Sequence, residues 1–476
     1  MKCNKIRFIE PGERPYKRTF LNYFVYDRYI RTPSVGLNLL ATIVKKEFDD
    51  TFMYSEAISK IVKNDVMDAD VIFIGIFTFN ANRGYRLAQY FKRKTKAVVV
   101  MGGLHASMNY REAVRYCDYV LLGEGDESIL ELLHCLREDR PVDIPGVAFL
   151  RDGRTVMTGK RQPPESIDGI PDRSLVWQYQ NRVHYNTIWP QVHASRGCPH
   201  NCDYCALVRH YGRRVRTRSV ADVIGDIRYS LKFFESGPFP RLLRGLWLTD
   251  DNFFAEREWA MDVLQAIIES GIRTNFTVQA RYEVGYDDEM LELLKMAGFF
   301  EIAMGIEFID DSDFRAYHKK STVEEVRRSI RNIQRHGLSV RGLFILGAEN
   351  NRRGIGDQLA DFVIENDIKG VLIQSMYFVP GTPVYEACQD RLLHRNWSKY
   401  NGCVVHDPVN ISPYDLQLEH IHASLKIYSF RRLLHSLLYD DPLHKLLFIG
   451  EFFWHRSICR DLRAELPYLR EKSRNR

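Results

Sequence analysis

No hydrophobic run in this sequence approaches the roughly 20 residues that an α-helix needs to cross a membrane. The chain also lacks internal repeats and low-complexity segments, and its charged content of 27% is ordinary for a globular protein. Its first five residues lead into an expected strand and do not read as a signal peptide. These absences favour a globular, cytoplasmic protein.

The cysteine and charge patterns exclude two further classes. The nine cysteines are odd in number and only three of them cluster, which argues against a disulfide framework and for a reducing compartment. The net charge of +6 is uneven, because residues 421–476 hold eleven Lys and Arg against six Asp and Glu, or +5. The rest of the chain is nearly neutral, so we expect no nucleic-acid partner.

At 476 residues the chain is long enough for two or three domains. Within residues 1–140, short β-rich runs alternate with helical patterns, and this order predicts a doubly wound, Rossmann-like α/β domain with a parallel sheet. Such sheets bind ligands beyond the carboxyl ends of their strands. The residues expected in those loops are Thr78, Phe79, Asn80, Gly102, Gly103, His105, Ser107, Gly123, Glu124 and Gly125.

Two further segments follow. Residues 141–187 read as a connector with a hairpin, because Asp152-Gly153 stands between apolar runs. Residues 188–385 contain six strand–helix units, which are too few for a full eightfold barrel and predict a partial (β/α)6 barrel. Residues 386–476 form a mainly helical C-terminal extension.

The most informative motif is the run Cys198-x3-Cys202-x2-Cys205. Three thiolates at this spacing can hold three irons of a [4Fe–4S] cluster, whereas complete ligation by protein takes four. No fourth cysteine follows nearby, so one iron would stay open to a small molecule. The alternatives are a zinc site, which usually needs four ligands in paired units, or three unrelated core cysteines.

With Tyr204 before its last cysteine, the run resembles the signature of the radical S-adenosylmethionine (SAM) superfamily. The resemblance implies that SAM chelates the open iron and that an electron from the cluster cleaves SAM to a 5′-deoxyadenosyl radical. It also implies an electron donor such as flavodoxin or ferredoxin. The cluster cysteines would then lie after the first strand of an open six-stranded barrel.

Residues at the ends of later strands match the same superfamily. In the resembled family, the glutamate of Gly305-Ile306-Glu307 contacts SAM, and the segment containing Ile345 and Gly347 lies against the adenine. In Gln279-Ala280-Arg281 the arginine could grip the SAM carboxylate with two hydrogen bonds. Asp250 and Asp251 could bind the SAM amino group, handle substrate protons, or cap the next helix. Glu307 could also be a capping or surface residue.

The N-terminal domain resembles the cobalamin-binding domain that precedes many radical SAM domains. The resemblance rests on residues 33–41, on the Gly-Gly-x-His-Ala-Ser loop at 102–107 and on Gly-Glu-Gly-Asp-Glu at 123–127. The Asp-x-His-x2-Gly motif of proteins that ligate cobalt with histidine is missing, and His105 does not fit it. We therefore expect cobalamin without a histidine ligand, with Phe79 or Asn80 facing its lower side. The alternative is a flavodoxin-like scaffold that has lost its ligand.

Residues 379–386 resemble the Pro-Gly-Thr-Pro-x-Tyr segment of the cobalamin-type group, and Tyr385 and Asp251 are the candidate catalytic residues. That group includes hopanoid and bacteriochlorophyll methylases and the anaerobic protoporphyrin ester cyclase. The resemblance implies a methyltransferase acting on an unactivated carbon of a small-molecule, lipid or tetrapyrrole substrate. The alternatives are a cyclase or rearrangement enzyme with the same cofactors, a methylthiotransferase, or a non-catalytic cobalamin sensor.

The tail from residue 424 is aromatic, leucine-rich and basic. A basic amphipathic helix can lie on an anionic membrane surface, which would add peripheral membrane association. The other interpretation is a C-terminal helix packed on the barrel. The sequence does not identify the substrate.

Overall fold

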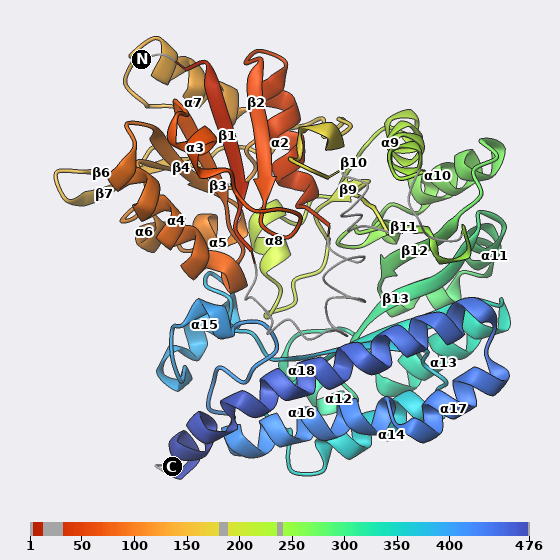
Figure 1. Ribbon diagram of the computed structural model, residues 1–476. Coiled ribbons are helices and arrows are strands. Elements are labelled where there is room, and N and C mark those ends of the chain that lie inside the picture. The colour runs from red at the N-terminus through yellow and green to blue at the C-terminus, as the bar shows by residue number, and fades with distance from the viewer. Residues whose placement is uncertain (1–2, 13–31, 180–188, 236–240, 475–476) are drawn as a thin grey trace.

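The computed structural model describes residues 3–12, 32–179, 189–235 and 241–474. Two mainly parallel sheets and a C-terminal layer of helices make up most of the architecture (Figure 1). The predicted boundary between connector and barrel, at 187/188, lies outside the described residues. None of the described helices combines the length and the apolar character that a membrane crossing requires.

The N-terminal sheet has seven strands in the order β2-β1-β3-β4-β5-β6-β7. Its five parallel strands are β1 (Lys5–Glu10), β2 (Asp50–Ser55), β3 (Val71–Gly75), β4 (Val98–Gly102) and β5 (Tyr119–Leu121). The main helices between them are α2 (Val35–Lys45), α4 (Ala81–Lys94) and α7 (Ser128–Arg137), and the shorter ones are α3 (Lys63–Met67), α5 (Leu104–Met108) and α6 (Tyr110–Ala113). This arrangement confirms the predicted doubly wound domain.

The hairpin that the sequence places in a connector belongs to this sheet. Strands β6 (Val147–Arg151) and β7 (Arg154–Met157) pair antiparallel with each other, and β6 pairs antiparallel with β5. The Asp152-Gly153 turn lies where predicted, and both residues adopt positive φ. The first sheet therefore extends beyond residue 140.

The second sheet has six parallel strands in the order β15-β14-β13-β12-β11-β8. Its strands are β8 (Gln191–Val192), β11 (Gly245–Leu248), β12 (Asn275–Ala280), β13 (Phe299–Glu307), β14 (Ser339–Leu346) and β15 (Gly370–Ser375). The helices between them are α9 (Val220–Phe233), α10 (Arg257–Glu269), α11 (Asp288–Met296), α12 (Asp311–Ala316), α13 (Val323–Arg335) and α14 (Ile355–Glu365). Consecutive strands are neighbours, which confirms the partial barrel.

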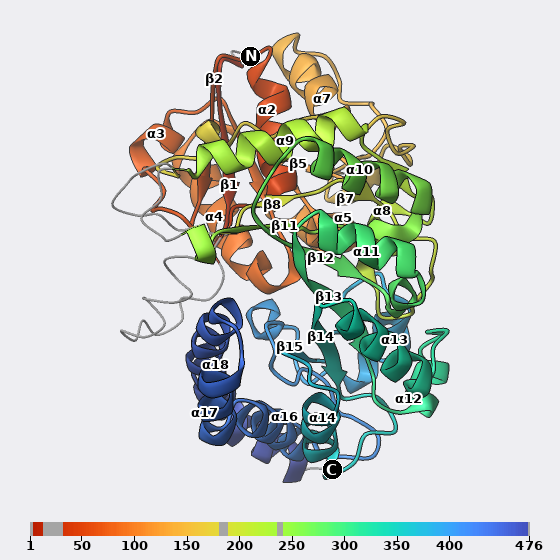
Figure 2. The same ribbon diagram turned by 90° about the vertical axis from the view of Figure 1, so that its right-hand side faces the viewer.

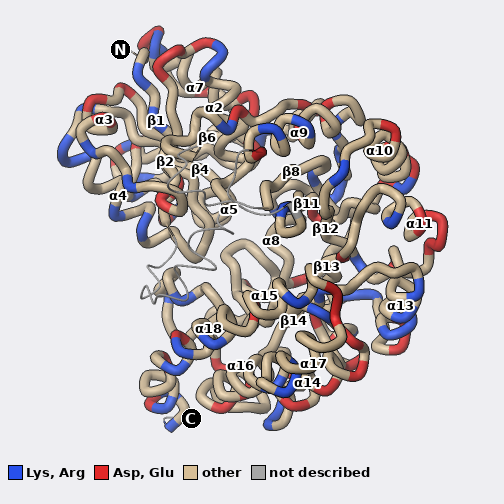
Figure 3. The backbone as a smooth tube through the Cα atoms, turned by 45° about the vertical axis from the view of Figure 1, so that its right-hand side comes forward, with Lys and Arg blue, Asp and Glu red and all other residues tan. Residues whose placement is uncertain are grey.

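Charged residues are unevenly distributed between the surface of the molecule and its strands. Figure 3 shows Lys, Arg, Asp and Glu mainly on the outer helices and loops, whereas the strands are largely uncharged. Helix α13 illustrates the division: it begins with a capping box between Thr322 and Glu325 and buries Val326, Ile330 and Ile333.

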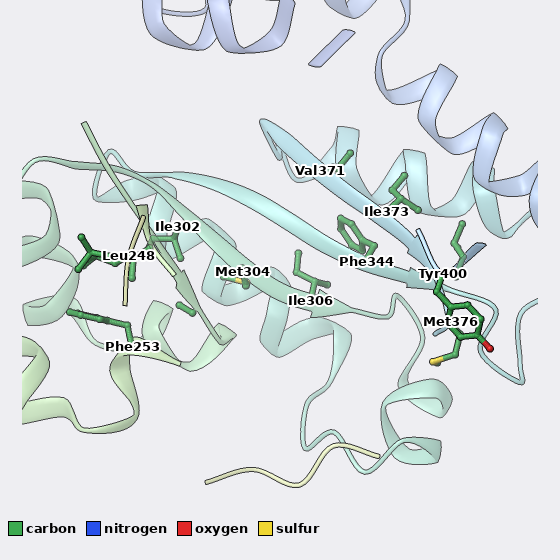
Figure 4. Packing of buried hydrophobic residues seen from close by; sticks show 14 of the residues in the cluster. Leu248, Phe253, Ile302, Met304, Ile306, Phe344, Val371, Ile373, Met376 and Tyr400 are labelled. Atoms are coloured by element: carbon green, nitrogen blue, oxygen red, sulfur yellow. The ribbon is translucent and has the colours of Figure 1, made fainter. Parts of the chain in front are cut away.

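The barrel core is built from alternate residues of the strands. On β13, Ile302, Met304 and Ile306 are fully buried and share one face, as the two-residue period of a strand requires (Figure 4). Phe344 of β14 lies beside them in the same cluster. This packing leaves the carboxyl ends of the strands to carry the polar residues of the site.

The C-terminal extension comprises α15 (Pro383–Ala387), η8 (Trp397–Lys399), α16 (Pro413–Ile427), α17 (Phe430–Tyr439) and α18 (Pro442–Arg474). Figure 2 shows α16, α17 and α18 together beside α14 at one end of the barrel. Half-buried Arg341 of β14 donates to Glu301 and pairs with Glu451 of α18, and Tyr428 donates to Glu451. The long helix is thus held on the barrel, while α17 leaves much of its apolar surface exposed.

Candidate active site

The cysteine motif lies in a loop between two short strands that pair antiparallel, β9 (Ser195–Arg196) and β10 (Arg216–Thr217). Helix α8 (Ala206–Tyr211) follows the last cysteine and lies between the N-terminal sheet and the barrel (Figure 1). Gly197 has φ of 94°, and a Cβ there would lie 2.4 Å from the carbonyl oxygen of Arg214. Glycine is therefore required before the first cysteine, because the chain entering the loop passes very close to the chain leaving it.

The three thiols of the cysteine loop differ in exposure. Cys202 is buried, whereas Cys198 and Cys205 are half-buried, and all nine cysteines are free. Among the described residues no three His, Cys, Asp or Glu side chains converge closely enough to hold one metal ion. A cluster does not need such convergence, because each thiolate binds a different iron. Burial raises the pKa of Cys205 to about 11, so a bound cation would be needed to hold it as a thiolate.

Two predicted SAM-binding residues stand beside the loop. Arg281, just after β12, places Nη1 4.0 Å from Cys202 Sγ and pairs with Glu283 at 3.0 Å. Glu307 ends β13, and its negative charge, after burial, contributes to the raised pKa of Tyr204. Arg281 thus lies beside Cys202, and both Glu307 and Cys202 lie close enough to Tyr204 to raise its pKa. Gln279 is half-buried on β12 and pairs in register with Ala303.

The acidic pair after β11 supports the loop. Asp250 is 1% exposed and accepts hydrogen bonds from the Ala194 amide (3.0 Å) and the Ser195 hydroxyl (2.6 Å). Asp251 accepts a hydrogen bond from the Gly197 amide at 3.2 Å. Burial raises the pKa of Asp250 to about 7 and that of Asp251 to about 6. Neither caps α10, whose N-cap position is Glu256, so their observed contacts are with the chain entering the cysteine loop.

The end of β14 is shaped by a residue from the C-terminal extension that sequence reasoning missed. Gly347 has φ of 98°, and a Cβ there would lie 2.9 Å from Cε1 of His406. His406 is buried, and its Nε2 lies 3.2 Å from the Gly347 carbonyl oxygen. Ile345 is half-buried two residues earlier. The extension therefore fixes the strand end predicted to lie against adenine.

Tyr385 lies where three parts of the chain meet. It is buried on α15, which begins at Pro383 and is capped by the Thr382 hydroxyl. The Val384 amide donates to the carbonyl oxygen of Asp203, in the cysteine loop, at 3.4 Å. On the other side, a Cβ on Gly381 would lie 2.8 Å from Met108 Sδ in the N-terminal domain. Burial raises the pKa of Tyr385.

A pocket lies between the two sheets. On the N-terminal side it is lined by the carboxyl ends of β3, β4 and β5 and the loops after them. The predicted residues on this wall are Gly102, Gly103, Gly123, Glu124 and Gly125. The barrel side is lined by residues flanking the cysteine run, among them His193, Ser195, Arg196, Leu207, His210 and Tyr211. The pocket is thus adjacent to the cysteine loop.

Of the loop after β3, Ile76 and Phe77 line the pocket. Phe77 is 40% exposed, and Phe79 stacks on it with ring centroids 5.7 Å apart. Asn80 is buried: its Oδ1 accepts from the Phe77 amide at 2.8 Å and its Nδ2 donates to the Pro11 carbonyl at 3.1 Å. Phe79 and Asn80, which the sequence predicts as ligand-binding residues, therefore hold Phe77 in place. Phe77 itself was not predicted, because the sequence has two phenylalanines after this strand and does not show which of them lines the pocket.

Three more predicted residues stand behind the pocket wall. His105 is fully buried, its Nδ1 lies 3.2 Å from the Thr78 hydroxyl, and its ring meets Trp397 edge-on at 4.9 Å. Burial lowers the pKa of His105 to about 3, so it is neutral. The Ser107 hydroxyl accepts a hydrogen bond from the Gly123 amide at 3.0 Å. These side chains shape the glycine loops.

Glu124 joins the two walls. It is almost fully buried and binds two arginines of the barrel side, Arg196 (Nη1 to Oε2, 2.5 Å) and Arg216 (Nη1 to Oε2, 3.1 Å). Arg196 also donates to both oxygens of Asp126 at 2.9 Å. Arg196 and Arg216 are the paired residues of β9 and β10, so both arms of the cysteine loop are bound to the N-terminal domain.

Residues 192–354 match the radical SAM superfamily. The chain is 26% identical to bacteriochlorophyllide d C-12(1)-methyltransferase of Chlorobaculum tepidum, over 77% of this chain and 76% of that protein. It is also 26% identical to hopanoid C-2 methylase of Rhodopseudomonas palustris, over 82% and 68%. The radical SAM methyltransferase TsrM of Kitasatospora setae, solved with cobalamin and a [4Fe–4S] cluster, superposes with a TM-score of 0.69 at 15% identity, covering 97% of this chain and all of that one. The chain therefore carries a radical SAM domain within the fold that the sequence predicts.

Proposed function

We propose that this chain is a cobalamin-dependent radical SAM methyltransferase that methylates an unactivated carbon of a small molecule. The observation that carries the proposal is the placement of a glycine-walled pocket directly against the cysteine loop, with Arg196 common to both. When bound, the cluster would supply the electron that cleaves SAM and cobalamin would supply the methyl group. The comparisons support this choice over the cyclase, because the match covers 76% and 68% of the two methyltransferases and 52% of the cyclase relative of Rubrivivax gelatinosus.

The residues present fit these groups. Cys198, Cys202 and Cys205 leave one iron position of a cluster open. Arg281, whose guanidinium faces Cys202, would bind the SAM carboxylate, and Glu307 would accept hydrogen bonds from its amino group or ribose. Because glycines form much of the N-terminal wall, a flat macrocycle could approach the backbone there closely.

Two residues are assigned to the substrate side. Tyr385 lies between the cysteine loop and the N-terminal domain, where its hydroxyl would orient substrate or exchange a proton with it. Asp251, whose pKa is raised by burial, is bound to the Gly197 amide and would act near the same loop. Tyr385→Phe should lower product formation more than SAM binding, which separates a role toward substrate from one toward SAM.

The test uses the anaerobically reconstituted protein with methyl-labelled SAM and a metabolite extract. Mass spectrometry should find 5′-deoxyadenosine, S-adenosylhomocysteine and a product carrying the labelled methyl group. Formation of 5′-deoxyadenosine with a converted but unlabelled product would instead establish the cyclase or rearrangement reaction. Absence of both SAM-derived products, in a protein with full iron content, would overturn the proposal.

An acidic electron carrier of the flavodoxin or ferredoxin class would dock at the cysteine loop. Arg209, Arg213 and Arg214 are exposed just after the cysteines, and Arg213 donates to the Pro199 carbonyl within the loop at 3.2 Å. Opposite charge on the carrier would accelerate association, an effect that salt screens. Arg213→Ala with Arg214→Ala should slow cluster reduction by the carrier at low salt and leave reduction by dithionite unchanged. Equal rates with the carrier would contradict the docking site.

Helix α17 would rest on an anionic membrane surface. Its exposed side chains include Phe430 (72%), Leu434 (59%), Leu438 (62%) and Tyr439 (73%), an unusual apolar surface beside the basic charge of the tail. The wild-type protein should sediment with phosphatidylglycerol vesicles and much less with phosphatidylcholine vesicles. Leu434→Ser with Leu438→Ser should abolish that binding, and sedimentation equal to wild type would refute the contact.

A further inference from the structure

The end of β13 adopts a conformation that few residues tolerate. Glu307 has φ of 72°, in the left-handed region, and the pairing of β13 with β14 shifts register between Gly305 and Glu307. A residue with a Cβ pays an energetic cost there, so surrounding contacts must hold the turn. The carboxylate folds back over Gly305, because a Cβ on that glycine would lie 2.8 Å from Glu307 Oε1.

The contacts that hold this turn come from Lys319. Its Nζ donates to the carbonyl oxygens of Gly305 (2.5 Å) and Ile306 (3.3 Å) and lies 3.7 Å from Glu307 Oε1. The lysine is 4% exposed. An ammonium group has three donors, and here three acceptors from consecutive residues face it. A buried lysine is costly unless it is satisfied in this way.

The segment that carries Lys319 is itself tied to the cysteine loop. His318 has φ of 52°, and its Nδ1 lies 2.6 Å from Asp203 Oδ2. The Asp203 amide also donates to the Tyr317 carbonyl at 3.5 Å. Residues 317–319 therefore connect the cysteine loop on one side with the end of β13 on the other.

We propose that Lys319 is a positioning residue, which holds Glu307 in its left-handed turn and directs its carboxylate toward the SAM beside the cysteine loop. The inference rests on the proposed function, since it presupposes SAM at Glu307. Lys319 acts through Glu307 and does not touch SAM. Replacing Lys319 should therefore weaken SAM binding only in a protein that still has the carboxylate of Glu307.

The experiment measures the dissociation constant of SAM by equilibrium dialysis, with iron content and thermal unfolding recorded for each variant of the reconstituted protein. Glu307→Ala should weaken binding about ten- to a hundredfold, the range of a charge-assisted hydrogen bond. Lys319→Met should weaken it about tenfold or more with unchanged iron. Lys320→Met, at the exposed neighbouring lysine, is the matched control and should bind as wild type.

The double variant separates positioning from general damage. If Lys319 acts through Glu307, Lys319→Met adds no further loss in the Glu307→Ala background, so the two effects are non-additive. Additive effects, or wild-type affinity in Lys319→Met, would overturn the inference while leaving the proposed function intact. Should Lys319→Met lose iron, Lys319→Gln replaces it, and loss of iron in both assigns the lysine to the fold and equally overturns the inference. Failure of the wild-type protein to bind SAM would overturn the proposed function itself, and the inference with it.

Discussion

Glu124→Gln tests the ion-pair cluster that joins the N-terminal domain to the cysteine loop. The substitution keeps the shape of the side chain and removes its charge. Arg216, 4% exposed at its side chain, would lose its only carboxylate partner among the described residues. Arg196 would keep its two hydrogen bonds to Asp126. The perturbation therefore falls mainly on β10.

The magnitude follows from what Arg216 retains. Removing one partner of a buried ion pair costs about 3–5 kcal/mol, because the other charge stays buried without compensation. Here Arg216 still donates to the carbonyls of Pro164 (3.0 Å) and Tyr211 (3.4 Å), and glutamine still offers one acceptor. We therefore expect the lower end of the range, about 3 kcal/mol of local opening free energy.

Hydrogen exchange measured by mass spectrometry reports that local free energy. At about 1.4 kcal/mol per decade, peptides covering residues 195–217 should exchange on the order of a hundredfold faster in Glu124→Gln, while peptides from α13 stay unchanged. Glu365→Gln, which removes an exposed partner of Arg327, is the control and should change neither. Unchanged exchange in 195–217 would refute the reasoning. Full additivity with Arg216→Met would also refute it, since paired residues must couple.

Three further predictions concern the cofactors and stability. Replacing Cys198, Cys202 and Cys205 together by alanine should remove about four irons and four sulfides per chain and abolish SAM cleavage, and a full [4Fe–4S] signal in that variant would contradict the assignment. Paramagnetic resonance of Co(II)-cobalamin bound to the protein should show no histidine nitrogen coupling; if coupling appears, His193→Phe and His210→Phe identify the ligand. Burial lowers the pKa of six histidines to about 3 or 4, so the unfolded chain takes up their protons first, and the free energy of unfolding should fall from pH 6.5 toward 4 by about 1.4 kcal/mol per histidine and pH unit. They are His105, His193, His210, His406, His420 and His455. Asp250 and Asp251, with pKa values raised to about 7 and about 6, oppose this trend but are fewer than the histidines. Urea unfolding that gives the same free energy at pH 5.5 as at pH 7.5 would contradict the prediction.

The elements predicted correctly from the sequence are those whose signal is local. The strand at 71–75 is a continuous apolar run, and the hairpin at 147–157 has its Asp-Gly turn. Strand β2 has a weaker local signal, because its first residue is exposed and it forms the edge of the sheet, so its apolar pattern is incomplete. The hairpin's place in the sheet was missed for another reason: its partner β5 lies far back in the sequence, and no turn signal specifies that pairing.

The same distinction applies to the site. The cysteine run and the glycine loops are contiguous motifs, so both can be recognised from the sequence. The structure places the glycine loops on the pocket wall, next to residues that flank the cysteine run. Glu124 was predicted as a ligand-binding residue, yet its carboxylate is occupied by arginines 72 and 92 positions away. Lys319 carries no local signal, because its acceptors are carbonyl oxygens, which any residue supplies.

Such long-range contacts share one consequence: they fix the cysteine loop from three directions. Glu124 holds its two arms, His318 holds Asp203 from the segment before Lys319, and α15 holds the Asp203 carbonyl through the Val384 amide. Reactions between bound groups lose rate steeply when those groups are displaced by about 1 Å. A loop proposed to hold metal ligands between the two sheets would move with either part of the chain unless it were bound to both. The buried charges of Glu124, Arg216 and Lys319 are therefore best explained by the accuracy with which they place this loop and the strand end facing it.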